Sequence, residues 1–126
     1  MTGRILIVDD EELFRKLMLS YFDRLGLTAF AVRSGAEAFQ LLRTEATPID
    51  LILLDIAMPQ QNGFEFARLL RADPELAHIP MMAVTARAGV EIEHQARESG
   101  IDRMIAKPPD PNVLHALCVE FGLIDS

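Results

Sequence analysis

Five short apolar segments alternate with five amphipathic stretches along the 126 residues, which predicts a doubly wound α/β domain built on a parallel sheet. The apolar segments lack polar alternation, as is typical of strands covered by helices on both faces. The stretches between them carry apolar residues at three- and four-residue spacing, together with helix-capping signals. We therefore expect five βα units with right-handed crossovers in a single domain, residues 1–126.

The five strands are predicted from compact apolar runs. They are "RILIV" (Arg4 to Val8), "TAFAV" (Thr28 to Val32), "LILL" (Leu51 to Leu54), "MMAV" (Met81 to Val84) and "RMIA" (Arg103 to Ala106).

The first two helices are predicted from periodicity and from a capping signal. Residues 11–25 form the first helix, with an apolar stripe of Phe14, Met18, Tyr21, Phe22 and Leu25. The tetrapeptide from Ser34 to Glu37 is a capping-box pattern that opens the second helix.

The last three helices are predicted from their ends. Residues 64–72 form a helix that Asp73-Pro74 stops, and residues 90–99 form one that ends at Gly100. Asp110 is an N-cap with Pro111 at the first helical position, and a stripe follows at Leu114, Leu117, Cys118 and Phe121.

The composition excludes several classes of protein. The net charge of −7 argues against nucleic acid or an anionic membrane as a direct partner, because both need a basic face. No apolar run approaches the roughly 18 residues of a membrane span, so we expect a cytoplasmic protein. The lone cysteine, Cys118, is expected to be a buried small hydrophobe, and no zinc spacing occurs.

Polar residues stand at the carboxyl ends of four of the five predicted strands. Asp9-Asp10, Asp55, Thr85 and Lys107 occupy these ends, which meet at one edge of a parallel sheet. Three crowded carboxylates repel one another unless a cation sits among them. Lys107 supplies one positive charge, and magnesium suits the remaining oxygen ligands.

Each residue alone has a simpler interpretation. The aspartates at positions 9 and 10 favour a helix N-terminus, Thr85 caps a turn, and Lys107 is a solvated chain end. Their coincidence at one edge favours a site. A dinucleotide site is disfavoured, because "VDDEEL" stands where a glycine-rich loop would cradle phosphate.

Four motifs, in this order and spacing, resemble the response-regulator receiver domain of two-component signalling. They are "ILIVDDEE", "DLILLDIAMPQQNGFE", "MMAVTA" and "IAKPP". The resemblance spans the whole chain and implies a flavodoxin-like sheet of order 2-1-3-4-5. It also implies a single-domain receiver similar to the chemotaxis regulators, and we expect no output domain in this chain.

The resemblance assigns roles to the site residues. Asp55 would be the phospho-acceptor, taking a phosphoryl group from a histidine kinase or histidine phosphotransfer protein. Magnesium would be held by Asp10, Asp55 and the backbone carbonyl of Ala57, with Asp9 acting through a metal-bound water.

The remaining roles concern the phosphoryl oxygens and the loop. Lys107, the Thr85 hydroxyl and the backbone N–H groups of Ala57 and Ala86 would contact those oxygens. Met58-Pro59 and Gly63 match the family's loop, and Gly63 is expected to supply a backbone conformation that a side chain resists. The Lys107-Pro108 peptide is commonly cis in the family, whereas X-Pro chemistry alone favours trans.

Three positions depart from the family's pattern or tune it. Receivers switch through the hydroxyl residue at the position of Thr85 and through an aromatic residue three positions before the lysine. In this sequence Met104 occupies the position of that aromatic residue. We expect a switch with weaker two-state character, because methionine is flexible. Ala57 cannot position an attacking water, and Arg87 either reaches phosphate or stays solvated. Together they predict a phosphoryl group that is not lost quickly.

The first helix carries extra leucines at positions 13, 17 and 19. A surface helix normally keeps a polar face, so two interpretations stand. Either the helix is broadly buried, or part of it docks a partner beside the site.

Three hypotheses for function follow. The leading one is a receiver that is not an enzyme, accepts phosphate with magnesium and docks a downstream protein, or purely relays phosphate. The second is an aspartyl-phosphate hydrolase, which is disfavoured because Ala57 stands where such enzymes carry a second Asp. The third is a binding module that is never phosphorylated. The sequence leaves open whether the chain is a fragment of a larger regulator or hybrid kinase, and whether it forms a homodimer.

Overall fold

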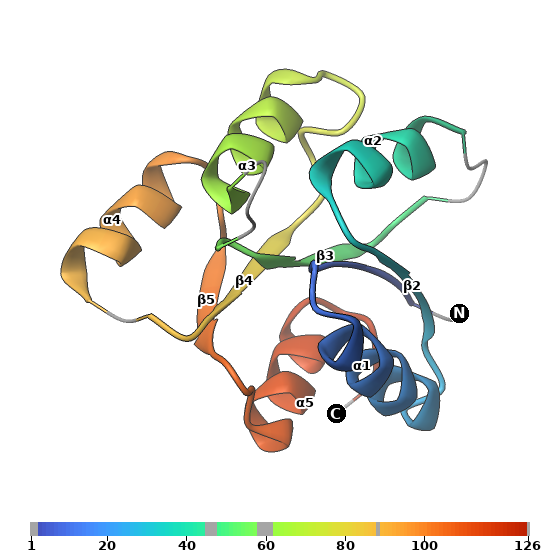
Figure 1. Ribbon diagram of the computed structural model, residues 1–126. Coiled ribbons are helices and arrows are strands. Elements are labelled where there is room, and N and C mark those ends of the chain that lie inside the picture. Colours follow the sequence, from blue (N-terminus) through green and yellow to red (C-terminus); the bar gives the residue numbers. More distant parts are fainter. Residues whose placement is uncertain (1–2, 45–47, 58–61, 88, 126) are drawn as a thin grey trace.

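The computed structural model describes residues 3–44, 48–57, 62–87 and 89–125. One parallel sheet of order β2-β1-β3-β4-β5 forms the middle layer, as the resemblance implied (Figure 1). Its strands are β1 (Arg4–Val8), β2 (Thr28–Val32), β3 (Leu51–Asp55), β4 (Met81–Thr85) and β5 (Arg103–Ala106).

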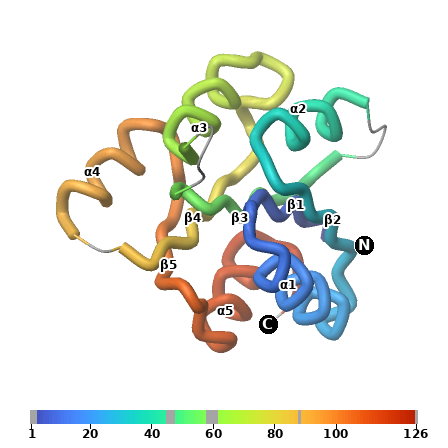
Figure 2. The backbone as a smooth tube through the Cα atoms, in the orientation of Figure 1, coloured from blue at the N-terminus to red at the C-terminus, as the bar shows by residue number. Residues whose placement is uncertain are grey.

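In the part of the chain that the structure describes, five helices cover the two faces of the sheet. They are α1 (Glu12–Arg24), α2 (Gly35–Thr44), α3 (Gly63–Ala72), α4 (Val90–Glu98) and α5 (Pro111–Glu120). Helices α1 and α5 lie on one face, and α2, α3 and α4 lie on the other (Figures 1 and 2). The predicted βα alternation is confirmed, and the predicted bounds hold to within one residue at each end.

Alternate residues of each inner strand enter two separate cores. Leu6 and Val8 pack on the α2–α3–α4 side with Phe66, whereas Ile5 and Ile7 pack on the α1–α5 side with Phe22. Because both faces are covered, each strand needs apolar residues at every position, which explains the continuous runs in the sequence. No helix in the described segments is long and apolar enough to span a membrane.

The predicted caps are largely confirmed. The Ser34 hydroxyl accepts the Glu37 N–H at 3.2 Å, but the Glu37 carboxylate accepts the N–H of Arg33 rather than that of Ser34. Asp110 accepts the Asn112 N–H at 2.8 Å. Sequence analysis missed the N-cap of α3, where the Asn62 side chain accepts the Glu65 N–H at 2.9 Å.

The expected role of Gly63 was wrong. Its φ is not positive, unlike that of Gly100, which ends the α4 region at +94° as predicted. A Cβ on Gly63 would instead lie 2.5 Å from the Ile56 Cα and 2.8 Å from the Asp55 carbonyl oxygen. The glycine therefore provides space for α3 to approach the end of β3.

Helix α1 is not broadly buried, so that interpretation was wrong. Phe14, Met18 and Phe22 are buried, but Leu13 is 77% exposed and Leu17 is 51% exposed. The thiol of Cys118 is buried as predicted, and this burial raises its pKa to about 11. Cys118 is therefore a packing residue rather than a nucleophile.

Candidate functional site

The predicted polar residues meet at the carboxyl edge of the sheet. Asp55 and Thr85 are the last residues of β3 and β4, while Asp9 and Lys107 directly follow β1 and β5. One carboxylate oxygen from each of Asp9, Asp10 and Asp55 lies within 4.8 Å of the other two. Register explains this convergence, because parallel pairing aligns Val8 with Leu54 and Asp55 with Val84.

Lys107 brings an ammonium group into this cluster. Its Nζ lies 2.9 Å from Asp9 Oδ2, 3.3 Å from Glu11 Oε1 and 3.6 Å from Asp55 Oδ2. The side chain is only 18% exposed, and the Lys107-Pro108 peptide is cis. Sequence analysis missed Glu11 as a partner, although it follows Asp9 and Asp10 directly in the chain.

Burial raises the pKa of Asp9, whereas its hydrogen-bond donors lower it. Asp9 is 1% exposed, and burial together with the charge of Asp55 raises its pKa. The Glu11 N–H at 2.8 Å and the Lys107 ammonium oppose this rise without cancelling it. Asp9 is thus a carboxylate whose ionised form needs additional positive charge.

The Lys107 ammonium is held in its charged form. Burial lowers its pKa, but the hydrogen bond to Asp9 and the charge of Asp55 outweigh burial, so the pKa of Lys107 is raised. The Lys107 ammonium faces the carboxylates of Asp9, Glu11 and Asp55, Asp10 adds a further negative charge beside them, and the site keeps a negative excess.

The donor set fits a hard divalent cation. Carboxylate oxygens of Asp9, Asp10 and Asp55 converge, Asp10 is exposed to incoming ions, and magnesium prefers such oxygens. The turn at Ala57 adjoins the cluster, because its N–H donates to Asp55 Oδ1 at 3.0 Å. The Ala57 carbonyl and a water at Asp9 remain predictions as further contributions to the metal site.

Thr85 caps a turn, as the simpler interpretation of the sequence suggested, and the contact of its hydroxyl with a phosphoryl oxygen stays a prediction. Its buried hydroxyl accepts the N–H of Arg87 at 3.0 Å and so caps the turn after β4. Its carbonyl accepts the N–H of Lys107 at 2.9 Å, which ties the end of β4 to the residue after β5.

Arg87, expected to tune hydrolysis, follows β4, and Met104, expected to take part in the switch, lies on β5 opposite Ala83 of β4. The Arg87 side chain is exposed, and Met104 is half-buried against the core beneath α2, α3 and α4. Met58-Pro59 of the expected loop lies outside the described residues. Residues from the ends of β3 and β4 and from α3 and α4 line a groove of about 720 Å³, including Ala57, Asn62, Phe64, Arg87 and Gln95.

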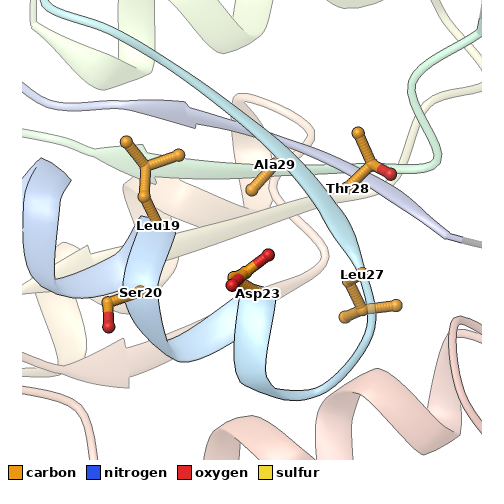
Figure 3. Close-up of a pocket in the computed structure, with 6 residues that line it drawn as sticks. All are labelled: Leu19, Ser20, Asp23, Leu27, Thr28 and Ala29. Atoms are coloured by element: carbon orange, nitrogen blue, oxygen red, sulfur yellow. The ribbon is translucent and has the colours of Figure 1, made fainter.

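A second hollow of about 470 Å³ lies between α1 and β2 (Figure 3). Leu19, Ser20 and Asp23 line it from α1, opposite residues 27–29 at the start of β2. Thr28 pairs with Arg4 at the amino end of the strands, so this hollow lies away from the acidic cluster.

The chain belongs to the response regulator receiver domain family. The sequence profile of that family matches residues 5–118, which include every residue of the acidic cluster.

Two curated relatives are similar along most of the chain. The polar-differentiation response regulator DivK of Brucella ovis is 43% identical over 108 residues, covering 86% of each chain. The protein of the same name from Brucella anthropi is 41% identical over the same length and coverage.

Solved structures share the fold. The signal receiver domain of a signal transduction histidine kinase from Syntrophus aciditrophicus has a TM-score of 0.85 at 29% identity, covering 99% of this chain and 95% of that one. The chemotaxis protein CheY4 of Vibrio cholerae has a TM-score of 0.88 at 22% identity, covering 96% and 99%. This second likeness concerns the fold alone.

Proposed function

We propose that this receiver accepts a phosphoryl group on Asp55 from a histidine kinase or histidine phosphotransfer protein, in the presence of Mg²⁺, and signals by docking a downstream protein. The observation that carries the proposal is the convergence of Asp55, two further carboxylates and Lys107 at one strand edge. A retired site has no physical reason to keep crowded like charges, because each costs solvation free energy.

Asp55 is positioned for nucleophilic attack. It ends a buried strand, and 7% of the residue stays exposed. An Asp55 oxygen forms the new O–P bond, while the donor's P–N bond breaks and its electron pair returns to the imidazole. The product is an aspartyl phosphate.

Other groups of the chain neutralise the transferred charge. Lys107 moves from Asp9 and Asp55 to a phosphoryl oxygen, and the Thr85 hydroxyl leaves the Arg87 N–H for another. The Ala57 N–H, which donates to Asp55 in this structure, then donates to a phosphoryl oxygen. When bound, Mg²⁺ would be held by Asp10, Asp55 and the Ala57 carbonyl, with Asp9 through water, and it would supply the remaining positive charge.

The chain acts once per phosphoryl group and is not an enzyme with a separate substrate in this proposal. Ala57 carries no group that positions water, which supports a long-lived phosphoryl group. Survival of the label for only seconds would contradict this part of the proposal.

The structural response to phosphorylation involves Thr85 and Met104 in this proposal. Met104 is half-buried against a core and methionine is flexible, so we expect it to repack gradually rather than between two discrete positions. Backbone chemical shifts measured during titration with a phosphate mimic test this. Unchanged shifts around both residues would favour a pure phosphate carrier.

The main test is labelling with a small phosphodonor and Mg²⁺, followed by intact mass. The wild type should gain one phosphoryl group, Asp55→Asn should gain none, and Asp23→Asn, an exposed carboxylate on α1, should label like the wild type. An unlabelled wild type would favour a binding module without phosphorylation. Equal labelling of Asp55→Asn would reassign the acceptor.

A further inference from the structure

Lys107 has a fourth neighbour that carries no charge. Its Nζ lies 4.5 Å from the centroid of the Phe14 ring, and it also contacts Asp9, Glu11 and Asp55. Phe14 is a buried residue of α1 that packs with the core on the α1–α5 side of the sheet. The ring therefore stands on a fixed support next to the lysine.

An aromatic face attracts an ammonium group through its quadrupole, and the attraction grows when water is excluded. Lys107 is largely shielded, so the ring contributes to where the ammonium rests. The attraction is weaker and less directional than that of a carboxylate. It can confine Lys107 near Asp55 without competing strongly with an incoming phosphoryl oxygen.

We propose that Phe14 is a positioning residue for phosphoryl acceptance, holding the Lys107 ammonium beside Asp55 with the face of its ring. The proposal rests on the proposed function, since it concerns how readily Asp55 accepts the phosphoryl group. Phe14 carries no acid, base or metal ligand, so it acts through Lys107 alone.

Two replacements separate ring electrostatics from packing. Phe14→Leu removes the ring, and a ring-fluorinated phenylalanine at position 14 keeps the shape but withdraws negative charge from the ring face. Phe22→Leu is the matched control, because Phe22 is a buried aromatic of the same helix whose ring packs against Tyr21. Labelling rates with the small phosphodonor are measured at saturating Mg²⁺, below the melting temperature of every variant.

We expect labelling about fivefold slower in both Phe14 variants and unchanged in Phe22→Leu. The two leucine variants should lose comparable stability, so a rate change confined to position 14 reports positioning. Wild-type rates in the fluorinated protein would overturn the proposal, and so would equal slowing in Phe22→Leu.

A second readout does not depend on phosphorylation. The Lys107 ε-methylene protons should show an upfield ring-current shift in the wild type that Phe14→Leu abolishes and Phe22→Leu preserves. Absence of that shift in the wild type would overturn the proposal directly. A wild type that shows the shift but takes no label would instead contradict the proposed function and leave the contact itself established.

Discussion

The carboxyl and amino edges of the sheet differ in their balance of charge. At the carboxyl edge, the carboxylates of Asp9, Glu11 and Asp55 lie around the Lys107 ammonium, Asp10 adjoins them, and negative charge is in excess. At the amino edge of β4 and β5, the Arg71 guanidinium pairs with Asp102 at 2.9 Å. Here one positive charge meets one negative charge.

The amino edge is also saturated with hydrogen bonds. Asp102 Oδ2 accepts the Met81 N–H at 2.8 Å as well as the Arg71 guanidinium. Arg71 further donates to three backbone carbonyls, at 2.7 Å for Ala77, 2.6 Å for Ile79 and 2.9 Å for Gly100. One side chain thereby joins α3, the approach to β4 and the turn between α4 and β5.

This difference indicates that the amino edge contributes to stability and the carboxyl edge to reactivity. Arg71 gives three backbone carbonyls a charged hydrogen-bond donor. These bonds stabilise the fold at the amino edge without any ligand. The acidic edge is destabilised by its own charges until a cation or a phosphoryl group enters. Three substitutions test this contrast, taken from the largest expected effect to the smallest.

Asp10→Asn should change the acidic edge most. We expect at least a hundredfold slower labelling by a small phosphodonor, because an exposed ligand of the proposed Mg²⁺ site is lost. Mg²⁺ at a hundred times its Kd should stabilise the wild type by about 2.7 kcal/mol, and this gain should vanish. Without metal, the variant should melt higher than the wild type, since one like charge is gone. Thermal melts with and without Mg²⁺ measure both effects.

Asp23→Asn is the control for that experiment, because it removes the same charge from an exposed site on α1 away from the cluster. An Mg²⁺-dependent gain of equal size in the Asp10→Asn and Asp23→Asn proteins would contradict the metal site.

Arg71→Ala should weaken the amino edge. We expect a loss of about 2–4 kcal/mol in the free energy of unfolding, because Asp102 loses its charged partner and three carbonyls lose a donor. Arg71→Lys should recover little, since an ammonium cannot reproduce the guanidinium's planar fork. Urea unfolding measures these changes, and labelling below the transition should stay near the wild-type rate.

Arg68→Ala, at an exposed position of the same helix, should stay within about 0.5 kcal/mol of the wild type. A loss below about 1 kcal/mol for Arg71→Ala would show that the amino edge does not depend on this network.

Leu17→Ser should affect neither edge by itself. The side chain is half exposed on α1, so stability should change by about 0.5 kcal/mol or less. If α1 docks the phosphodonor protein, transfer from a histidine phosphotransfer protein should slow about tenfold while labelling by the small phosphodonor is unchanged. Quench-flow assays with both phosphodonors distinguish a loss of docking from a loss of reactivity at Asp55.

Leu69→Ser is the matched control, because Leu69 on α3 is also 51% exposed but lies on the other face of the sheet. Equal slowing in both leucine variants would remove the case for α1 as the docking surface.

The fold was predictable because its signals are local. Strands buried on both faces require unbroken apolar runs, and helix ends require caps such as Ser34, Asp110 and Gly100. The site was predictable for a related reason. Parallel strands bring their carboxyl ends to one edge, so Asp9, Asp55, Thr85 and Lys107 had to meet once the topology held.

The features that the sequence did not predict depend on side-chain packing. No pattern in the sequence shows that Gly63 is needed for space beside Ile56 rather than for its backbone angle. The exposure of Leu13 and Leu17 was equally open, because helical spacing gives a direction around the axis but not what covers it.

The sequence by itself determined the sheet, its two covering layers and the group of charged residues at one edge, because each follows from periodicity and chain order. Only the tertiary structure decided which groups touch. It placed the ammonium of Lys107 between Asp9, Glu11 and the ring of Phe14, and it joined Arg71 to Asp102. These contacts join residues far apart in the chain, and side-chain reach within a packed core fixes them.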